Sequence, residues 1–458
     1  MRVLFAAAEL APLIRVGGLA EAAGGLVNAL RAAGIEVTVA LPDYGGVQLA
    51  HESRRRLKVP RWAGSMWARS GVHETAGELT LIGSNALERP HPYVDSAGIG
   101  WPDNDVRFMQ FSAGVASLRD ATAPDVVHLN DWHTAAAVAL GKRPAPTVLT
   151  IHTLGYQGVA RPEWMRYLRR PGEFEWYQQT NPLLGGIKLS DRVVAVSPNY
   201  AREILEEESG MGLHEVLEWR SDVLVGILNG IDTADWDPAA DPHISKRYSL
   251  ESIGQRDANR ADLAAIAGWE ATREPIIGVV SRLVDQKGID LLLGAIPYLG
   301  DMPARLFVLG SGLVELAAPL AAAAAADPDR VYFHDGYDLA LAHRIFAGSD
   351  LFAMPSRFEP CGLAQMQAMR YGSIPVVTPV GGLVDTVIDA DAAPRKGNGF
   401  VAQSVDVVGI VDALHRAVRA FRNSRRRTAI QRRGMQHDWS WEGPAQQHIE
   451  LYKEVSEA

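Results

Sequence analysis

The chain has 458 residues, of which 47% are apolar types and 22% are charged. This length exceeds what one hydrophobic core usually spans, and the composition excludes a disordered or fibrous protein. The net charge of −9 argues against a nucleic-acid or membrane-surface binder, and the single cysteine, Cys361, excludes an internal disulfide. No stretch is apolar over the roughly 18 residues that a membrane span needs, so we expect a cytoplasmic protein.

Short apolar runs alternate with helical patterns through the first half of the chain. The run at 3–7 is followed by a glycine turn and by a predicted helix over 19–33. Further buried strands are predicted at 37–41, 125–129, 147–152 and 192–197. Strands that alternate with helices indicate a parallel, doubly wound sheet. Between Gly45 and Gly98 the periodicity is poor, and loops are expected to dominate.

The same alternation restarts after Asp241. Strands are predicted at 276–281, 306–310, 331–334, 351–355 and 375–378. Two complete series predict the fold class α/β with two Rossmann-like domains, residues 1–240 and 241–442, facing each other across a cleft. Residues 229–242 are the expected connector, and the last segment, 443–458, is expected to pack back on the first domain.

Polar residues that follow the predicted strands are the first candidates for a site, because ligands of open parallel sheets bind beyond the carboxyl ends of the strands. In the first domain these are Glu9, Arg15 to Gly18, Asp131 to His133, and His152. In the second domain they are Arg282, Lys287, Gly310 to Gly312, Tyr337, and Glu359 to Gly362.

Two of these segments are suited to phosphate. Gly17 and Gly18 lie between a strand and a helix, where backbone N–H groups can approach an anion, and Arg15 adds a cation beside them. Arg282 and Lys287 follow a strand and can converge on one diphosphate. A tight structural turn and a pair of solvated loop cations are the respective alternatives. The chain has neither a Walker loop nor the dinucleotide-binding glycine pattern.

Residues 355–363 form the most specific segment. A strand ends there, a proline-containing turn presents Glu359, and Gly362 opens a helix predicted over 363–371. The first amides of that helix could hold a phosphate while Glu359 bonds hydroxyl groups of the same ligand. The alternative for Glu359 is a capping role beside the helix dipole, and Cys361 is expected to be a small packed residue.

The histidines at strand ends are ambiguous, because lone histidines are more often structural than catalytic. Asp131, Trp132, His133 and His152 could nevertheless line one wall of the cleft. The Asp-x-Asp pairs are predicted in turns away from the strand ends, so no metal site is expected. These pairs are Asp235 with Asp237, Asp327 with Asp329, and Asp389 with Asp391.

With these residues the chain resembles the bacterial glycogen synthases and plant-type starch synthases, which are retaining glycosyltransferases of the two-domain GT-B fold. The resemblance covers nearly the whole length. The matching segments are Glu9 with 15–19, 101–104, 130–133, 150–157, 196–203, 228–232, 281–288, 336–337, 355–363 and 381–386.

The resemblance implies transfer of a glucosyl unit from ADP- or UDP-glucose to the end of an α-1,4-glucan. The residues implied in catalysis are His152, Arg282, Lys287 and Glu359. The implied donor-binding residues are Arg15, Gly17, Gly18, Asn229, Ser281, Gly312, Tyr337, Cys361, Gly362 and Leu363, with Tyr337 on the nucleobase. The implied acceptor-binding residues are Glu9, Tyr93, Asp131, Trp132, His133 and Thr153. No cofactor or metal is expected, and the expected partners are a nucleotide-sugar donor and a glucan or small-molecule acceptor.

The chain departs from the family pattern near the expected cleft. Arg15, Thr153, Leu184, Ala364 and Val380 stand where the family usually has Lys, Asn, Lys, Thr and Thr. Two alternatives therefore stay open. One is a relative in secondary metabolism that joins a nucleotide-activated sugar or cyclitol to a small acceptor. The other is a non-catalytic nucleotide-sugar-binding protein.

Overall fold

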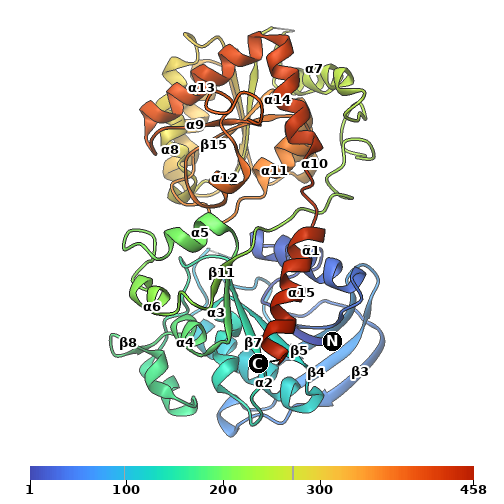
Figure 1. Cartoon of the computed structure of the whole chain (residues 1–458), viewed down its shortest axis with the longest axis vertical. Coiled ribbons are helices and arrows are strands. Elements are labelled where there is room, and N and C mark those ends of the chain that lie inside the picture. The colour runs from blue at the N-terminus through green and yellow to red at the C-terminus, as the bar shows by residue number, and fades with distance from the viewer. Residues whose placement is uncertain (97, 271–272, 458) are drawn as a thin grey trace. The chain divides into compact units, whose positions relative to one another are not determined.

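The computed structural model describes residues 1–96, 98–270 and 273–457, which form two compact units (Figure 1). Unit 1 comprises Met1–Gly230 together with the segment from Trp441 onward, and unit 2 comprises Ile231–Ser440. The first change of unit therefore falls before the expected residue 240. A backbone hydrogen bond explains where this boundary falls. The N–H of Ile231 donates to the carbonyl oxygen of Trp439 at 2.8 Å, so the two segments that connect the units are joined to each other within unit 2.

Unit 1 is built on a nine-stranded sheet in the order β11-β10-β7-β6-β1-β2-β5-β4-β3. Its central strands are parallel and buried on both faces, as short runs of Val, Leu and Ile predict. The strands are β1 (Arg2–Ala6), β2 (Glu36–Pro42), β3 (Ala50–Arg56), β4 (Trp67–His73), β5 (Gly77–Gly83), β6 (Val126–Asn130), β7 (Thr147–Ile151), β10 (Arg192–Ala195) and β11 (Leu224–Gly226). A separate hairpin pairs β8 (Glu175–Trp176) with β9 (Gln179–Thr180).

Loops and turns make up just over half of the described residues in 45–98, as expected, but the sequence did not predict the strands that form most of the remainder. Three of the nine strands, β3, β4 and β5, lie in this region; β5 extends the sheet parallel to β2, and β4 and β3 follow antiparallel. Every residue of the edge strand β3 is exposed, and Arg54 to Arg56 are basic. The sequence showed no alternation there because neither face of this strand is buried. Charged residues on an edge strand also discourage pairing with other chains.

Helices cover the unit 1 sheet, and the last helix of the chain, α15, packs beside α1 (Figure 1). The contact is close: a Cβ atom at Gly25 would lie 1.9 Å from Nε1 of Trp441, so only glycine fits there. The helices are α1 (Gly18–Ala32), α2 (Asn104–Thr122), α3 (Trp132–Ala135), α4 (Pro182–Leu189), α5 (Pro198–Glu203), α6 (His214–Trp219) and α15 (Glu442–Glu457). Short 3-10 turns are η1 (Arg61–Ala63), η2 (Ala136–Ala139), η3 (Pro162–Tyr167) and η4 (Pro171–Phe174).

Unit 2 has a six-stranded, fully parallel sheet in the order β14-β13-β12-β15-β16-β17. Its strands are β12 (Ile276–Val280), β13 (Arg305–Gly310), β14 (Val331–Asp335), β15 (Leu351–Met354), β16 (Ile374–Val377) and β17 (Phe400–Val401). Its helices are α7 (Arg256–Ile266), α8 (Ile289–Ala295), α9 (Val314–Ala326), α10 (Leu339–Gly348), α11 (Ala364–Arg370), α12 (Gly381–Thr386), α13 (Val407–Arg422) and α14 (Ser424–Gln436), with 3-10 turns η5 (Ile253–Gln255), η6 (Asp285–Lys287) and η7 (Ile296–Tyr298). None of the helices in the described part of the chain is long and apolar enough to cross a membrane.

The strand order of each unit reverses at one point. In unit 1 the chain moves outward from β1 to β2 and later returns to place β6 on the other side of β1; in unit 2 the same happens at β12 and β15. The crevice at such a reversal is where doubly wound sheets bind ligands. The topology therefore selects four loops, those after β1, β6, β12 and β15, and they carry Glu9, Asp131, Arg282 and Glu359.

Candidate active site

The loop after β12 carries the two cations that the sequence placed on a diphosphate. Arg282 is exposed and makes no ion pair with any residue that the structure describes. Lys287 ends the turn η6, and Gly288 follows in the left-handed conformation with φ 61°. A Cβ atom at Gly288 would lie 1.9 Å from the carbonyl oxygen of Pro355, so glycine lets this loop close onto the loop after β15.

Lys287 and Glu359 are joined directly in this arrangement. The Nζ atom of Lys287 lies 2.6 Å from Oε2 of Glu359, and the Ser356 hydroxyl donates to the same oxygen at 3.0 Å. Glu359 is only 5% exposed, so its charge needs the ammonium group beside it. Lys287 therefore neutralises the Glu359 carboxylate, and Lys287 and Ser356 together hold it in one orientation.

A pair of glycines fixes the backbone around Glu359. The N–H of Gly382 donates to the carbonyl oxygen of Glu359 at 3.0 Å, and a Cβ atom at Gly381 would lie 1.8 Å from that oxygen. The next residues, Cys361 and Gly362, lead into α11, and Cys361 is buried as expected. The amide nitrogen of Gln365 donates to the carbonyls of both residues, which keeps this turn rigid.

The loops after β12 and β13 run side by side. Leu283 exchanges backbone hydrogen bonds of 2.8 Å with Ser311 and Leu313, and a Cβ atom at Gly312 would lie 2.3 Å from the Leu283 carbonyl oxygen. After β14, Tyr337 is 80% exposed and precedes the residue that caps α10. An aromatic ring is thereby free to stack at this edge of the sheet.

In unit 1, Glu9 occupies amides that the sequence had suggested for a phosphate. Its Oε2 atom accepts the N–H groups of Val16 at 2.7 Å and Gly17 at 2.9 Å, and its Oε1 atom accepts the Tyr93 hydroxyl at 2.6 Å. Arg15 is paired with Glu21 at 3.3 Å. A Cβ atom at Gly17 or Gly18 would meet no atom within 4 Å, so packing does not require glycine at either position.

Asp131 and His152 are linked through the backbone. Oδ1 of Asp131 accepts the N–H of His152 at 2.7 Å, and Asp131 has a positive φ of 53°. Burial raises the pKa of Asp131 to about 7, against the effect of the His152 and Thr153 N–H groups, which favour the charged form. This carboxyl group sits at the start of α3, where its loop meets the end of β7.

Asn130 fixes the tautomer of His152. Nδ2 of Asn130 donates to the Ala6 carbonyl at 3.0 Å, so its Oδ1 accepts from Nε2 of His152 at 2.9 Å. Burial lowers the pKa of His152 to about 3, which keeps the ring neutral. Its Nδ1 atom is consequently a hydrogen-bond acceptor. Asn130 was not predicted as a functional residue, although it stands directly before Asp131 in a matching segment.

An aromatic wall adjoins these residues. The His133 ring lies 5.1 Å from Tyr93, 4.7 Å from Phe108 and 4.2 Å from Trp132, measured between ring centroids. Burial lowers the pKa of His133 to about 3. His133 is therefore a neutral, buried packing residue, and the partly exposed rings of Tyr93 and Trp132 are the part of this wall that is open to a sugar.

The structure shows what two of the residues that depart from the family pattern do, namely Thr153 and Leu184. The Thr153 hydroxyl accepts the N–H of Gly155 at 3.1 Å, which makes it part of a local turn. Leu184 is 1% exposed inside α4, so its side chain is a packing residue of unit 1. The neighbouring glycines explain this burial, since a Cβ atom at Gly185 would lie 2.1 Å from the Phe174 ring.

Comparisons with known proteins follow the same two units. The family model described as the starch synthase catalytic domain matches residues 2–219, and the model described as glycosyl transferases group 1 matches residues 266–434. The glycogen synthase of Halorhodospira halophila is 42% identical to this chain over 99% of both proteins. Glycogen synthase 2 of Bradyrhizobium diazoefficiens is 40% identical over 100% of this chain and 98% of that protein. The chain belongs to the glycogen synthase and starch synthase family.

Solved structures agree with this family assignment. The catalytic domain of starch synthase IV from Arabidopsis thaliana, bound to ADP and acarbose, has a TM-score of 0.88 at 31% identity and covers 100% of this chain and 99% of that chain. Sucrose-phosphate synthase from Thermosynechococcus elongatus, at 18% identity and a TM-score of 0.64, shares the fold. As a family member the chain is a GT-B, nucleotide-sugar-dependent glycosyltransferase. The comparisons do not favour the secondary-metabolism enzyme or the non-catalytic binder.

We expect Glu359→Gln to impair use of the donor more than folding in this family member. Glutamine keeps the shape and can accept from Ser356, but it no longer attracts Lys287, so the Michaelis constant for the nucleotide sugar should rise about tenfold or more. Steady-state kinetics and thermal unfolding measure the two effects, with the exposed Glu251→Gln as control. An unchanged donor profile would remove Glu359 from the site.

Proposed function

We propose that the protein elongates an α-glucan with glucosyl units taken from a nucleoside diphosphate glucose, with retention of the α configuration. In this proposal the diphosphate of the donor binds to residues of unit 2, and unit 1 supplies the acceptor-binding residues together with His152 and Asn229, which contact the donor sugar. The observation that carries this proposal is the donor loop pair of unit 2. At the reversal of the strand order stand the Lys287–Glu359 pair and an exposed Arg282 that has no ion pair among the described residues, and Tyr337 is exposed after the edge strand β14. The starch synthase IV neighbour bound to ADP and acarbose supports both ligand classes.

The reaction exchanges one bond for another at the anomeric carbon. The bond to the diphosphate oxygen breaks, its electron pair leaves with the phosphate, and the acceptor hydroxyl oxygen bonds to the same face of the sugar. The acceptor proton passes to the departing phosphate oxygen. Arg282 and Lys287 stabilise the negative charge that develops on this leaving group, and such fixed charges usually supply the largest catalytic contribution.

The remaining side chains orient the sugars. Glu359, neutralised by Lys287, accepts from hydroxyl groups of the donor glucose, and Asn229 adds a further polar contact. The neutral His152 offers Nδ1 to a hydroxyl near the reacting carbon, because Nε2 is committed to Asn130. Glu9, held by Tyr93 and two backbone amides, and the aromatic wall contact the acceptor.

The proposed reaction uses no metal ion. Each Asp-x-Asp pair has a member bound to arginine: Asp237 to Arg370, Asp327 to Arg330, and both Asp389 and Asp391 to Arg416. These carboxylates are committed to ion pairs in unit 2. We further infer a reducing, cytoplasmic location, in which the single buried Cys361 stays a thiol.

A nucleotide panel followed by a glucan assay tests the proposal. Thermal unfolding is recorded with ADP, UDP, GDP and TDP, and the glucose conjugate of the best nucleotide is then incubated with a maltooligosaccharide. We expect one nucleotide to raise the unfolding midpoint, and the chain products to lengthen by single glucose units with α-1,4 linkage. Stabilisation without elongation would instead support the small-acceptor enzyme. No stabilisation by any nucleotide would contradict the donor site.

A further inference from the structure

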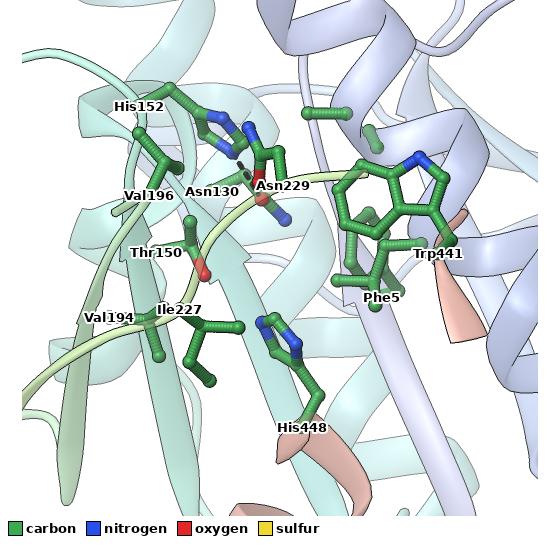
Figure 2. A pocket seen from close by; sticks show the side chains of 13 residues that line it. Phe5, Asn130, Thr150, His152, Val194, Val196, Ile227, Asn229, Trp441 and His448 are labelled. Atoms are coloured by element: carbon green, nitrogen blue, oxygen red, sulfur yellow. Dashed lines mark hydrogen bonds between the residues drawn. The ribbon is translucent and has the colours of Figure 1, made fainter. Parts of the chain in front are cut away.

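Unit 1 contains a small cavity beneath His152 that the proposed chemistry does not use (Figure 2). It has room for about one water molecule. Most of its lining is apolar, but five polar side chains contribute to it: Asn130, Thr150, His152, Asn229 and His448. Four of these belong to β6, β7 and the segments that follow β7 and β11, whereas His448 comes from the C-terminal helix α15.

His448 points an unpaired acceptor into this cavity. Its ring is 3% exposed, and Nδ1 lies 2.9 Å from the carbonyl oxygen of Pro444, one helical turn earlier. Because a carbonyl oxygen can only accept, Nδ1 carries the proton and Nε2 has a lone pair. Nε2 is buried and has no hydrogen-bond partner among the described residues. Figure 2 shows the ring extending from α15 into the space beneath Thr150.

Protonation of the His448 ring does not explain why Nε2 has no hydrogen-bond partner. The ring of His448 lies 5.6 Å from that of His128, which is itself bonded to Tyr452 and Thr150 and is fully buried. Burial lowers the pKa of His448 to about 4, so the ring is neutral at ordinary pH. An acceptor of this kind needs a donor from a small molecule inside the cavity.

Asn229 supplies the second polar group. It is 9% exposed, lines the same cavity, and its side chain makes no hydrogen bond to the described residues. Asn130, by contrast, is committed to Ala6 and His152. A water molecule can accept from one group and donate to two others, and such bridges are common where buried polar groups would otherwise be unpaired.

We propose that this cavity binds one ordered water molecule, which donates a hydrogen bond to Nε2 of His448 and hydrogen-bonds the side chain of Asn229. His448 is thereby a positioning residue: through the water, the C-terminal helix fixes the orientation in which Asn229 meets the donor sugar. The role assigned to Asn229 rests on the proposed function. The water site itself rests only on the cavity and the unpaired nitrogen.

Two substitutions separate the two nitrogens of His448. His448→Asn retains a donor near the position of Nδ1 but removes the atom that faces the cavity, whereas His448→Gln retains a polar atom near the position of Nε2 and loses the bond to Pro444. We expect His448→Asn to raise the Michaelis constant for the donor about tenfold, with that for the acceptor unchanged. His448→Gln should stay within about twofold of the wild type for both substrates.

A crystal structure of the wild-type protein at high resolution supplies the independent readout. Density for a water molecule within hydrogen-bond distance of both Nε2 and Asn229 is expected. An empty cavity would overturn the proposal, as would equal losses in the two variants or a donor Michaelis constant unchanged in His448→Asn. If the wild type transfers no glucose, the proposed function fails, and the density alone decides the water site. The same density decides it if His448→Asn does not fold.

Discussion

Arg282→Ala is expected to reduce turnover by at least ~100-fold without changing the thermal unfolding midpoint. The guanidinium group is exposed and bound to no carboxylate in the described chain, so removing it leaves no buried charge behind. The effect should therefore fall on donor binding and the chemical step rather than on folding, because the leaving diphosphate loses a stabilising cation. Steady-state rates with the nucleotide sugar identified by the stability panel measure it.

Lys287→Ala should show the same loss of turnover together with a loss of stability. Glu359 is 5% exposed, and removing the ammonium group 2.6 Å away leaves its carboxyl group buried without that partner, which destabilises the fold by about 2–3 kcal/mol. The contrast between the two variants separates catalysis from folding. The exposed Arg395→Ala is the control for removing a cation from unit 2. Near-normal rates in both Arg282→Ala and Lys287→Ala would rule out the mechanism.

Acid is expected to unfold unit 1 well above the pH at which ordinary carboxylates titrate. His128, His133 and His448 are at most 7% exposed, and burial lowers the pKa of all three. The pKa of His128 lies well below its usual value, that of His133 is about 3, and that of His448 is about 4. An unfolded histidine has a pKa of about 6.5. From about pH 6.5 down to about 4, the unfolded chain therefore binds more protons than the folded one, and stability is lost as the pH falls.

Asp131 opposes this trend. Burial raises its pKa to about 7, so between about pH 4 and 7 its folded form binds one proton more than the unfolded form. Three histidines against one carboxyl group leave a net difference of about two protons. The free energy of unfolding should fall by about 2.7 kcal/mol for each pH unit below about 6. The partly exposed His152, whose pKa burial also lowers to about 3, acts in the same direction; counted in full, it raises the net difference to about three protons and the slope to about 4.1 kcal/mol per pH unit.

Urea unfolding at a series of pH values checks this expectation. His448→Gln should flatten the dependence by about 1.4 kcal/mol per pH unit, because it removes one group that titrates only when unfolded. His51→Gln, at an exposed position of β3, is the matched control and should leave the dependence unchanged. A stability that is level between pH 7 and 5 would contradict the neutral, buried state of these histidines.

The sequence by itself determined the α/β class, the parallel sheets and the loops that carry the candidate site. A strand that is buried on both faces must be apolar throughout, so it can be recognised from a short run of apolar residues in the sequence. Residues placed after such strands, among them Asp131, Arg282 and Glu359, follow from the rule that ligands bind at the carboxyl ends of parallel strands. Even Gly362 and the helix after it could be read from the chain alone.

Only the tertiary structure decided which of these groups meet. Lys287 and Glu359 are 72 positions apart, and their contact depends on Gly288 passing the backbone of Pro355, a close approach that leaves no periodic signal. The Glu9 carboxylate accepts a hydrogen bond from the Gly17 N–H, which the sequence had suggested for a phosphate. The exposed edge strand β3 shows no alternation of apolar and polar residues, so the sequence did not predict it. His448 reaches the cavity because α15 returns to unit 1. Contacts between distant segments are set by packing, and packing is a property of the whole fold rather than of any window of residues.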